Sequence, residues 1–256
     1  MAALSLLAAP TGMAAQDGPR WYDLEAPGVG TRLAVLRPAP GVGAAPRPAL
    51  LVLPGGVGTT DLVLRALERF AIHPARRGYW VVALEGDASY LETSAGAVVP
   101  AVFDWMAGRG IDTTRVALVG VSNGGLGAFF AAAGAPGRFG ALVGMPGRFV
   151  GTLEEASRLR GLPIRLFVGE HDGNWLDGAR QTRSVLGQVG VDVEVEVLPA
   201  QGHRLDLDMA AVMDWIDAAL SGRGAPDPRH SVRPVRPRGD PSLSLEADSP
   251  AGGSTL

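Results

Sequence analysis

A serine in a glycine-rich turn is the first residue whose surroundings indicate chemistry. Residues 120–124 read Gly-Val-Ser-Asn-Gly, a G-x-S-x-G pattern with Ser122 at its centre. An apolar run precedes the pattern and a segment of small and apolar residues follows it, which predicts a sharp turn between a strand and a helix. Such a turn exposes the hydroxyl and points the helix N-terminus at the site where negative charge develops during acyl transfer. Because the chain holds 36 glycines, the alternative is a glycine-rich helix start that Ser122 merely caps.

The longer motif, Gly-Val-Ser-Asn-Gly-Gly at 120–125, resembles the nucleophile elbow of the α/β-hydrolases. Its Ser-Asn-Gly-Gly form is similar to that of polyester-depolymerase-like and feruloyl-esterase-like members, and of prolyl-oligopeptidase-type peptidases. The chain length resembles the dienelactone-hydrolase and carboxylesterase branch. The resemblance covers residues 31–221 by motif order and element pattern, and it leaves the subfamily open. It implies a serine hydrolase with no cofactor and no metal.

The resemblance also implies where the catalytic base lies, because in this fold the acid and then the histidine follow the serine in the chain. The chain has four histidines. His203 follows an apolar run that ends at Leu198 and precedes the last predicted helix, which is the family's position for the base. His73 precedes the serine, and His230 falls in the C-terminal tail. The alternative for His203 is an ordinary histidine on a surface loop.

Asp172 is the expected acid, which would orient the imidazole and stabilise the imidazolium. It comes shortly after the apolar run 164–168, where the resemblance implies the acid. Glu170 and Asp177 are rivals. Glu170 lies closer to the strand end, and Asp177 is expected to cap the following helix. His171 is expected at the surface or rim.

Two backbone N–H groups are needed to hold the oxyanion. One belongs to the residue after the nucleophile, Asn123. The second is expected from the Pro-Gly-Gly-Val loop at 54–57, where Gly56 is favoured and Val57 is the alternative. The common His-Gly start of this loop is replaced by Pro-Gly, which leaves the donor open between the two.

Substrate-pocket candidates come from apolar and aromatic residues in the loops around the expected site. They are Val57, Tyr90, Met145 and Trp175, and core or loop packing is the alternative for each. Phe149 is a further residue that could line the cleft. The stretch 145–162 is too short to hold a large cap domain, which predicts an open cleft.

The elements that would position these residues alternate along the chain, and this alternation predicts a single α/β domain with a mostly parallel sheet. Continuous apolar runs indicate strands buried on both faces. Strands are expected near 31–36, 49–53, 80–84, 116–119, 141–143, 164–168 and 191–198, and helices near 61–70, 93–107, 124–133, 176–189 and 206–220. In such sheets, sites form at the carboxyl ends of the strands.

Composition excludes several classes of function. The formal net charge of −3 gives no reason to expect a nucleic-acid partner. The chain has no cysteine and no lysine, so thiolate nucleophiles, disulfides, Schiff-base chemistry and a P-loop are ruled out. No apolar run reaches the roughly 20 residues needed to span a bilayer.

The two ends of the chain differ from the middle. Residues 1–20 are expected to be a leader or a partial signal peptide, because an apolar run is followed by small residues but no basic segment precedes it. The protein would be secreted or periplasmic if this is a truncated signal, and cytoplasmic otherwise. Residues 222–256 are rich in Pro and Arg and are expected to be disordered. The hydrolase domain is predicted to span 21–221.

The function expected from these observations is hydrolysis of a carboxylic ester, small or polymeric, through a Ser-His-Asp triad. A prolyl-oligopeptidase-like peptidase and a lactone or thioester hydrolase use the same machinery and stay open. A noncatalytic hydrolase-like binding protein is the alternative from another class. The acyl and alcohol parts of the substrate and the oligomeric state are left open by the sequence.

Overall fold

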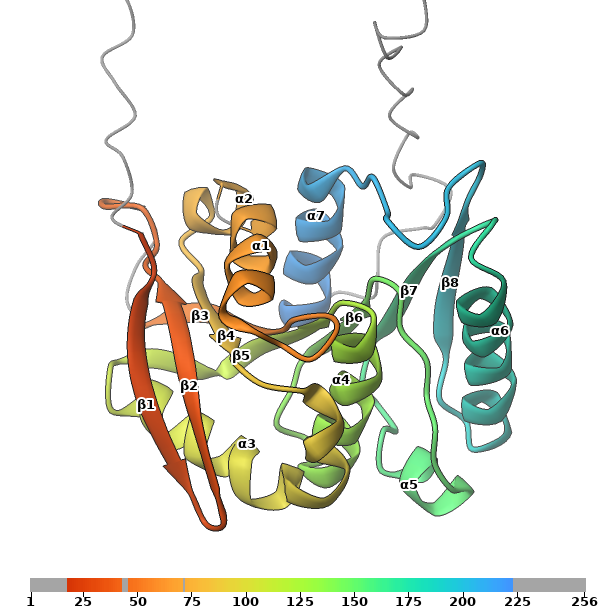
Figure 1. Cartoon of the computed structure of the whole chain (residues 1–256), viewed down its shortest axis with the longest axis horizontal. Coiled ribbons are helices and arrows are strands. Elements are labelled where there is room, and N and C mark those ends of the chain that lie inside the picture. The colour runs from red at the N-terminus through yellow and green to blue at the C-terminus, as the bar shows by residue number, and fades with distance from the viewer. Residues whose placement is uncertain (1–17, 43–45, 71, 223–256) are drawn as a thin grey trace, which may run out of the picture.

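The computed structural model describes residues 18–42, 46–70 and 72–222. These residues form an eight-stranded sheet flanked by helices (Figure 1). Its spatial order is β1-β2-β4-β3-β5-β6-β7-β8. β1 and β2 pair antiparallel, as do β2 and β4, and all other neighbours are parallel. The strands are β1 (Arg20–Ala26), β2 (Val29–Leu36), β3 (Arg47–Leu53), β4 (Trp80–Leu84), β5 (Ile111–Gly120), β6 (Ala141–Gly144), β7 (Ile164–Gly169) and β8 (Val193–Leu198).

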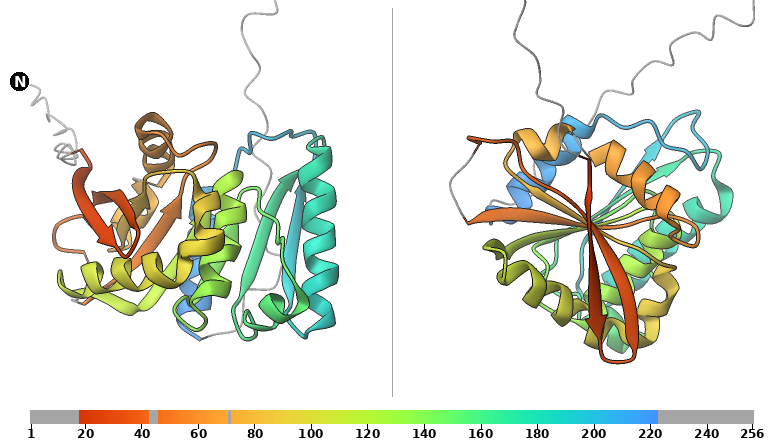
Figure 2. Two further views of the ribbon diagram at one scale, coloured as in Figure 1. Left: turned by 60° about the horizontal axis from the view of Figure 1, so that its bottom comes forward. Right: turned by 60° about the vertical axis from the view of Figure 1, so that its left-hand side comes forward.

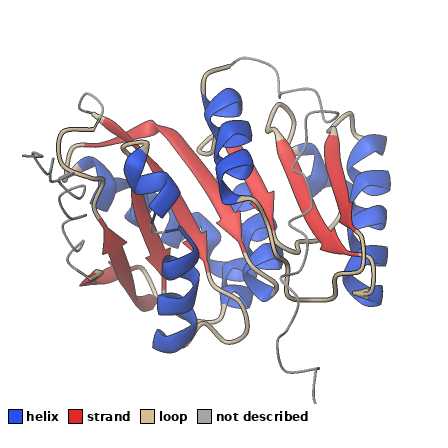
Figure 3. Ribbon diagram, turned by 90° about the horizontal axis from the view of Figure 1, so that it is seen from above, coloured by secondary structure: helices blue, strands red, loops and turns tan. Residues whose placement is uncertain are grey.

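Helices cover both faces of this twisted sheet (Figures 2 and 3). Helices α1 and α7 pack on one face, and α3, α4 and α6 pack on the other. The helices are α1 (Thr60–Phe70), α2 (Ile72–Arg76), the 3₁₀ helix η1 (Ala88–Tyr90), α3 (Leu91–Ala107), α4 (Asn123–Gly134), α5 (Leu153–Ser157), α6 (Gly173–Gln188) and α7 (Met209–Leu220).

The central strands contribute side chains to two hydrophobic cores, because successive side chains of a strand point to opposite faces of the sheet. In β3, Leu51 and Leu53 join the core beneath α3, α4 and α6, whereas Leu50 and Val52 join the core beneath α1 and α7. All four are at most 1% exposed. This double burial explains why the strand sequences read as unbroken apolar runs.

The predicted fold class is confirmed: the sheet is mostly parallel and flanked by helices, with no large cap. Between β6 and β7 the chain forms only the five-residue helix α5. Strand β1 was not predicted, because its polar and apolar residues do not alternate cleanly and it pairs only with β2 at the edge of the described sheet. The short helices α2, η1 and α5 were not predicted either, because they are too brief to show helical periodicity.

The predicted leader and tail lie almost entirely outside the described residues, and the proposed domain limits therefore stay predictions. Among the described residues, no helix is long and apolar enough to cross a membrane.

Candidate active site

Parallel strands bring three distant side chains to the same edge of the sheet. β5, β6, β7 and β8 are neighbours in that order. Ser122 follows β5, Asp172 follows β7, and His203 lies in the loop after β8. The carboxyl ends of parallel strands share one edge, where ligands bind in open α/β sheets.

The three side chains form a continuous hydrogen-bonded chain. Ser122 Oγ lies 2.8 Å from Nε2 of His203, and Nδ1 of His203 lies 2.8 Å from Oδ2 of Asp172. With its proton on Nδ1, the imidazole donates to Asp172 and accepts from the serine hydroxyl. The His203 side chain is 47% exposed, whereas that of Asp172 is only 12% exposed. The carboxylate is thus shielded from water while the imidazole faces the solvent side.

Ser122 sits on a strained turn that requires small neighbours. Its φ of 56° and ψ of −118° fall in a region that non-glycine residues rarely adopt. A Cβ at Gly120 would lie 2.2 Å from the carbonyl oxygen of Gly124, and one at Gly124 would lie 2.1 Å from that of Leu53. The two glycines of the G-x-S-x-G motif therefore let neighbouring backbone pass close to the serine.

Neither Ser122 nor Asp172 caps the helix that it precedes. Both occupy N-cap positions, of α4 and α6 respectively, and both are residue types that usually accept a hydrogen bond from the first turn. Their side chains make no capping hydrogen bond. The hydroxyl and the carboxylate turn toward His203 instead, so the alternative in which Ser122 only caps a helix does not describe this structure.

The rival acids have other contacts. Glu170 Oε2 accepts a hydrogen bond of 2.9 Å from the Ala200 amide, which ties the loop after β8 to the end of β7. Asp177 is exposed and lies 3.7 Å from Arg180 on the same helix. The expectation that Asp177 caps this helix is wrong, because α6 begins at Gly173 and includes Asp177.

The other histidines are placed apart from this hydrogen-bonded chain. His171 is exposed, as expected for a surface residue. His73 lies in α2, between β3 and β4 in the chain. His230 lies outside the described residues.

The loop after β3 meets the serine turn at the expected oxyanion hole. The Asn123 side-chain amide donates to the Gly56 carbonyl oxygen at 3.3 Å. Within the described part of the chain, the backbone amides of Gly56, Val57 and Asn123 have no backbone acceptor. The Gly56 carbonyl oxygen points at the Asn123 side chain. The N–H of Val57 belongs to the same trans peptide and therefore points away from that side chain. Both donors named from the sequence stay candidates.

The four substrate-pocket candidates have different surroundings. Trp175 packs beside the imidazole, and the ring centroids of Trp175 and His203 lie 5.7 Å apart. Val57 is 61% exposed on the rim of the loop after β3. Tyr90 is half-buried against the core, and burial raises its pKa to about 12. Met145 is 1% exposed and packs in the core beneath α1 and α7, so its side chain is core rather than a lining surface.

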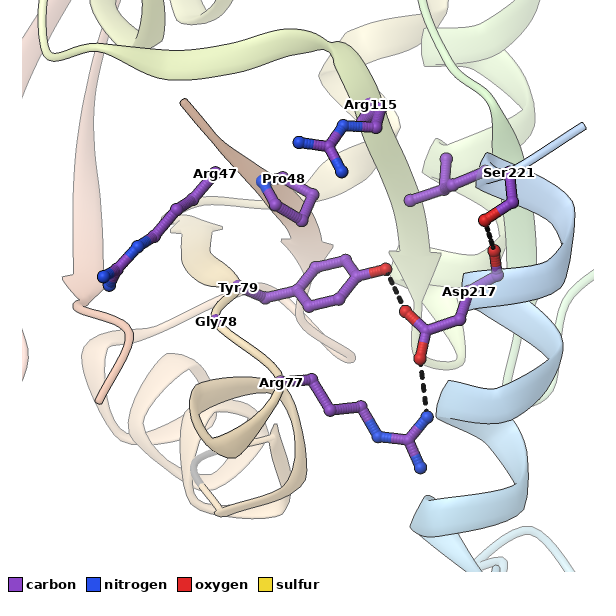
Figure 4. A pocket seen from close by; sticks show the side chains of 9 residues that line it. Arg47, Pro48, Arg77, Gly78, Tyr79, Arg115, Asp217 and Ser221 are labelled. Atoms are coloured by element: carbon purple, nitrogen blue, oxygen red, sulfur yellow. Dashed lines mark hydrogen bonds and ion pairs between the residues drawn. The ribbon is translucent and has the colours of Figure 1, made fainter. Parts of the chain in front are cut away.

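A hollow of about 170 Å³ lies on the side of the sheet away from the triad, near the start of β3 (Figure 4). Its walls come from the start of β3, the segment just before β4, the middle of β5 and the end of α7. In it, the Tyr79 hydroxyl and the Arg77 guanidinium both donate to Asp217. Arg115, also on the wall, pairs with Asp112 at 2.6 Å. These charges satisfy one another, which is typical of a structural cluster.

Sequence reasoning missed Arg148, which lies in the loop after β6 and stacks on Trp175 with Cζ 5.0 Å from the ring centroid. Its only signal in the sequence is its position just past the end of an apolar run. Among the described residues, no group of three or more His, Asp or Glu side chains could hold a metal ion.

Comparison with known proteins supports the fold at low sequence identity. No family model and no curated protein matches the sequence. A thermostable esterase superposes with a TM-score of 0.59 at 20% identity, covering 71% of this chain and 55% of its own. A protein of Klebsiella pneumoniae subsp. pneumoniae described as a dienelactone hydrolase superposes with a TM-score of 0.60 at 19% identity, covering 80% of this chain and 100% of its own. Dipeptidyl peptidase 4 of Porphyromonas gingivalis superposes with a TM-score of 0.59 at 14% identity, covering 80% of this chain and 35% of its own.

The chain spans about half the length of the esterase and about a third of that of the peptidase. All three neighbours superpose on this chain with TM-scores of 0.59 to 0.60, which shows a shared fold. The chain has the α/β-hydrolase fold.

Proposed function

We propose that the chain is a carboxylic ester hydrolase that works through an acyl-enzyme intermediate. The observation that carries this proposal is the hydrogen-bonded chain from Ser122 through His203 to Asp172, at the carboxyl edge of the sheet. A serine hydroxyl becomes a useful nucleophile only when a base accepts its proton. The 2.8 Å contact between Oγ and Nε2 provides that base.

In the first step, Ser122 Oγ attacks the ester carbonyl carbon while His203 Nε2 takes the hydroxyl proton. Asp172 holds the Nδ1 proton in place and stabilises the imidazolium without becoming protonated itself. The tetrahedral intermediate collapses, the carbon–oxygen bond of the ester breaks, and the imidazolium gives its proton to the departing alcohol. In the second step, water attacks the acyl-enzyme with the same base, which releases the acid and restores Ser122.

Backbone amides would hold the oxyanion in both steps. Asn123 N–H lies at the start of α4, where the helix dipole adds partial positive charge. Gly56 N–H, or Val57 N–H as the alternative, would be the second donor. One such donor contributes about 3 kcal/mol to transition-state stabilisation. The hydrogen bond from the Asn123 side chain to the Gly56 carbonyl keeps the two loops together.

The open surroundings favour a small ester or an extended one. His203 is half exposed and no cap domain lies between β6 and β7. A lactone or thioester hydrolase uses the same groups and is an alternative, as is a peptidase, since one neighbour in structure is a dipeptidyl peptidase. No cofactor or metal takes part in the proposed mechanism. A noncatalytic binding protein would not need the strained Ser122 backbone, which argues for the enzyme.

The test is a set of variants assayed on short-chain p-nitrophenyl esters, with peptide anilides, lactones and thioesters alongside. Ser122→Ala and His203→Ala should each lose nearly all turnover, and the double variant should lose little more, because the two groups act as a unit. Thermal melts would check that each variant is folded.

Fluorophosphonate labelling separates the enzyme from the binding protein. Wild-type protein should be labelled at Ser122, and the Ser122→Ala variant should not. Undiminished esterase activity in folded Ser122→Ala would refute the nucleophile. A wild-type protein that takes no label and hydrolyses none of the four substrate classes would establish the noncatalytic reading.

A further inference from the structure

We infer that Arg148 and Trp175 form a subsite for a carboxylate group of the substrate, next to the proposed triad. This inference rests on the proposed function and adds a substrate class to it: esters that carry a second, anionic group on the acyl chain.

The backbone places Arg148 close to the nucleophile. The carbonyl oxygen of Pro146, two residues earlier, accepts a hydrogen bond of 3.1 Å from the Ser122 amide. A Cβ at Gly125, in the first turn of α4, would lie only 2.1 Å from that same oxygen. The loop after β6 is therefore packed tightly against the serine turn, and Arg148 leaves it on the side of α6.

The side chain of Arg148 runs along α6 toward the start of that helix. Its stem crosses Gly178, because a Cβ there would lie 2.8 Å from Arg148 Cδ and 3.2 Å from Arg148 Cβ. Its guanidinium carbon then lies 5.0 Å from the ring centroid of Trp175, almost one turn nearer the helix start. α6 begins directly after Asp172. The positive charge is thus directed to the end of the helix that holds the triad.

Trp175 connects this charge to the imidazole. Its ring contacts the Arg148 guanidinium and also packs beside His203, at 5.7 Å between centroids and an angle of 43°. Trp175 is partly buried against the core, so it offers a fixed wall. An acyl chain that extends from the serine along this wall would meet the guanidinium at its far end.

In the described part of the chain, Arg148 forms no ion pair with Asp or Glu. Arg32, Arg77, Arg115 and Arg165 each form an ion pair with Asp or Glu. Among the described residues, the contact recorded for Arg148 is its stack on Trp175, and its buried Nε has no hydrogen-bond acceptor. A carboxylate binds a guanidinium through two parallel hydrogen bonds, and the two Nη groups of Arg148, rather than its buried Nε, would donate them.

The competing explanation is that Arg148 only braces Trp175 and, through it, the His203 ring. A brace would affect every substrate alike, whereas a carboxylate subsite affects only substrates with a negative charge. The ratio of kcat/KM for an anionic ester to that for a neutral ester of equal chain length separates the two.

The experiment compares monomethyl esters of succinic, glutaric and adipic acid with methyl butyrate, valerate and hexanoate in a pH-stat. Arg148→Gln should lower the anionic-to-neutral ratio by about 10-fold or more, because charge-assisted hydrogen bonds are roughly twice as strong as neutral ones. Arg183→Gln is the matched control: it removes the same charge from an exposed position on α6, and its ratio should equal that of wild type. Calorimetric titration with glutarate measures binding without turnover.

Fluorophosphonate labelling makes the outcomes distinguishable. If wild-type protein is labelled and Arg148→Gln changes neither the ratio nor glutarate binding, the subsite is overturned and the hydrolase stands. If the protein takes no label but binds glutarate in an Arg148-dependent way, the subsite stands and the proposed hydrolysis fails. If it shows neither labelling nor Arg148-dependent binding, both are refuted.

Discussion

The substitution Gly169→Ala should move the loop that carries His203 and remove most of the activity of the proposed enzyme. Gly169 ends β7, and a Cβ built on it would lie 2.2 Å from the Gly202 carbonyl oxygen and 2.4 Å from that of Gln201. Real Cβ atoms essentially never come within 3.0 Å of such an atom. The loop that carries His203 must therefore shift by roughly 1 Å, and a misplacement of that size can cost about 100-fold in rate.

The structure indicates how this loss divides between rate and stability. His203 directly follows Gly202, and its contact with Ser122 spans 2.8 Å. A shift of the loop lengthens this hydrogen bond, so kcat/KM should fall by about 100-fold, or about 2.7 kcal/mol. Overpacking should lower the free energy of unfolding by about 1–3 kcal/mol, which leaves a folded protein.

Gly173→Ala is the matched control, because Gly173 follows Asp172 directly and a Cβ there meets nothing within 4 Å. Alanine is favoured over glycine inside a helix by about 1 kcal/mol. This variant should keep wild-type activity and an equal or higher Tm. Esterase kinetics and calorimetric melts would measure both quantities. Wild-type kcat/KM in folded Gly169→Ala, or an equal loss in both variants, would refute the reasoning.

Two other changes test the carboxylates. Asp172→Asn should lower kcat on the order of 10⁴-fold, because an amide disfavours the required tautomer of His203. Glu170→Gln should retain most activity. The reverse ranking of these two variants in an ester assay would assign the acid to Glu170. The Arg32 guanidinium, which donates two hydrogen bonds of 2.6 Å, lowers the pKa of the Glu85 carboxyl. Stability from this pair is therefore present above the unfolded carboxyl's pKa of roughly 4.3 and is lost as the pH falls through the pKa of the folded state. The Tm difference between wild type and Glu85→Gln should shrink below that range. A Tm difference that does not depend on pH would contradict this prediction.

The sequence predicted the parts of the site that depend on local rules. The serine turn is encoded in five consecutive residues, so Ser122 could be located from its motif and the strand before it. Asp172 and His203 lie in loops directly after strands, and the parallel sheet brings those strand ends together. The strand ends, together with the chain order of the family that the motif resembles, selected three residues that the structure joins by two hydrogen bonds of 2.8 Å.

Features set by packing between distant segments could not be predicted in the same way. The stack of Arg148 on Trp175 exists because Gly178 leaves room for the arginine stem, and no local pattern links these three positions. Met145 looked like a loop residue near the site, yet its side chain enters the core beneath α1 and α7. The role of Glu170 also depends on a contact with the loop after β8, 30 residues away.

Helix capping gives an independent argument that the edge of the sheet is functional. Helices η1, α4, α5, α6 and α7 each begin after a Ser, Thr or Asp, as does α1 after Thr59. Asp87, Thr152 and Asp208 accept hydrogen bonds from the turns that they cap. Ser122 and Asp172 do not. A missing cap costs about 1 kcal/mol, and both omissions occur where the side chain contacts His203 instead. Local rules of stability are expected to fail at functional positions, and here they fail at the two residues that the proposed mechanism needs.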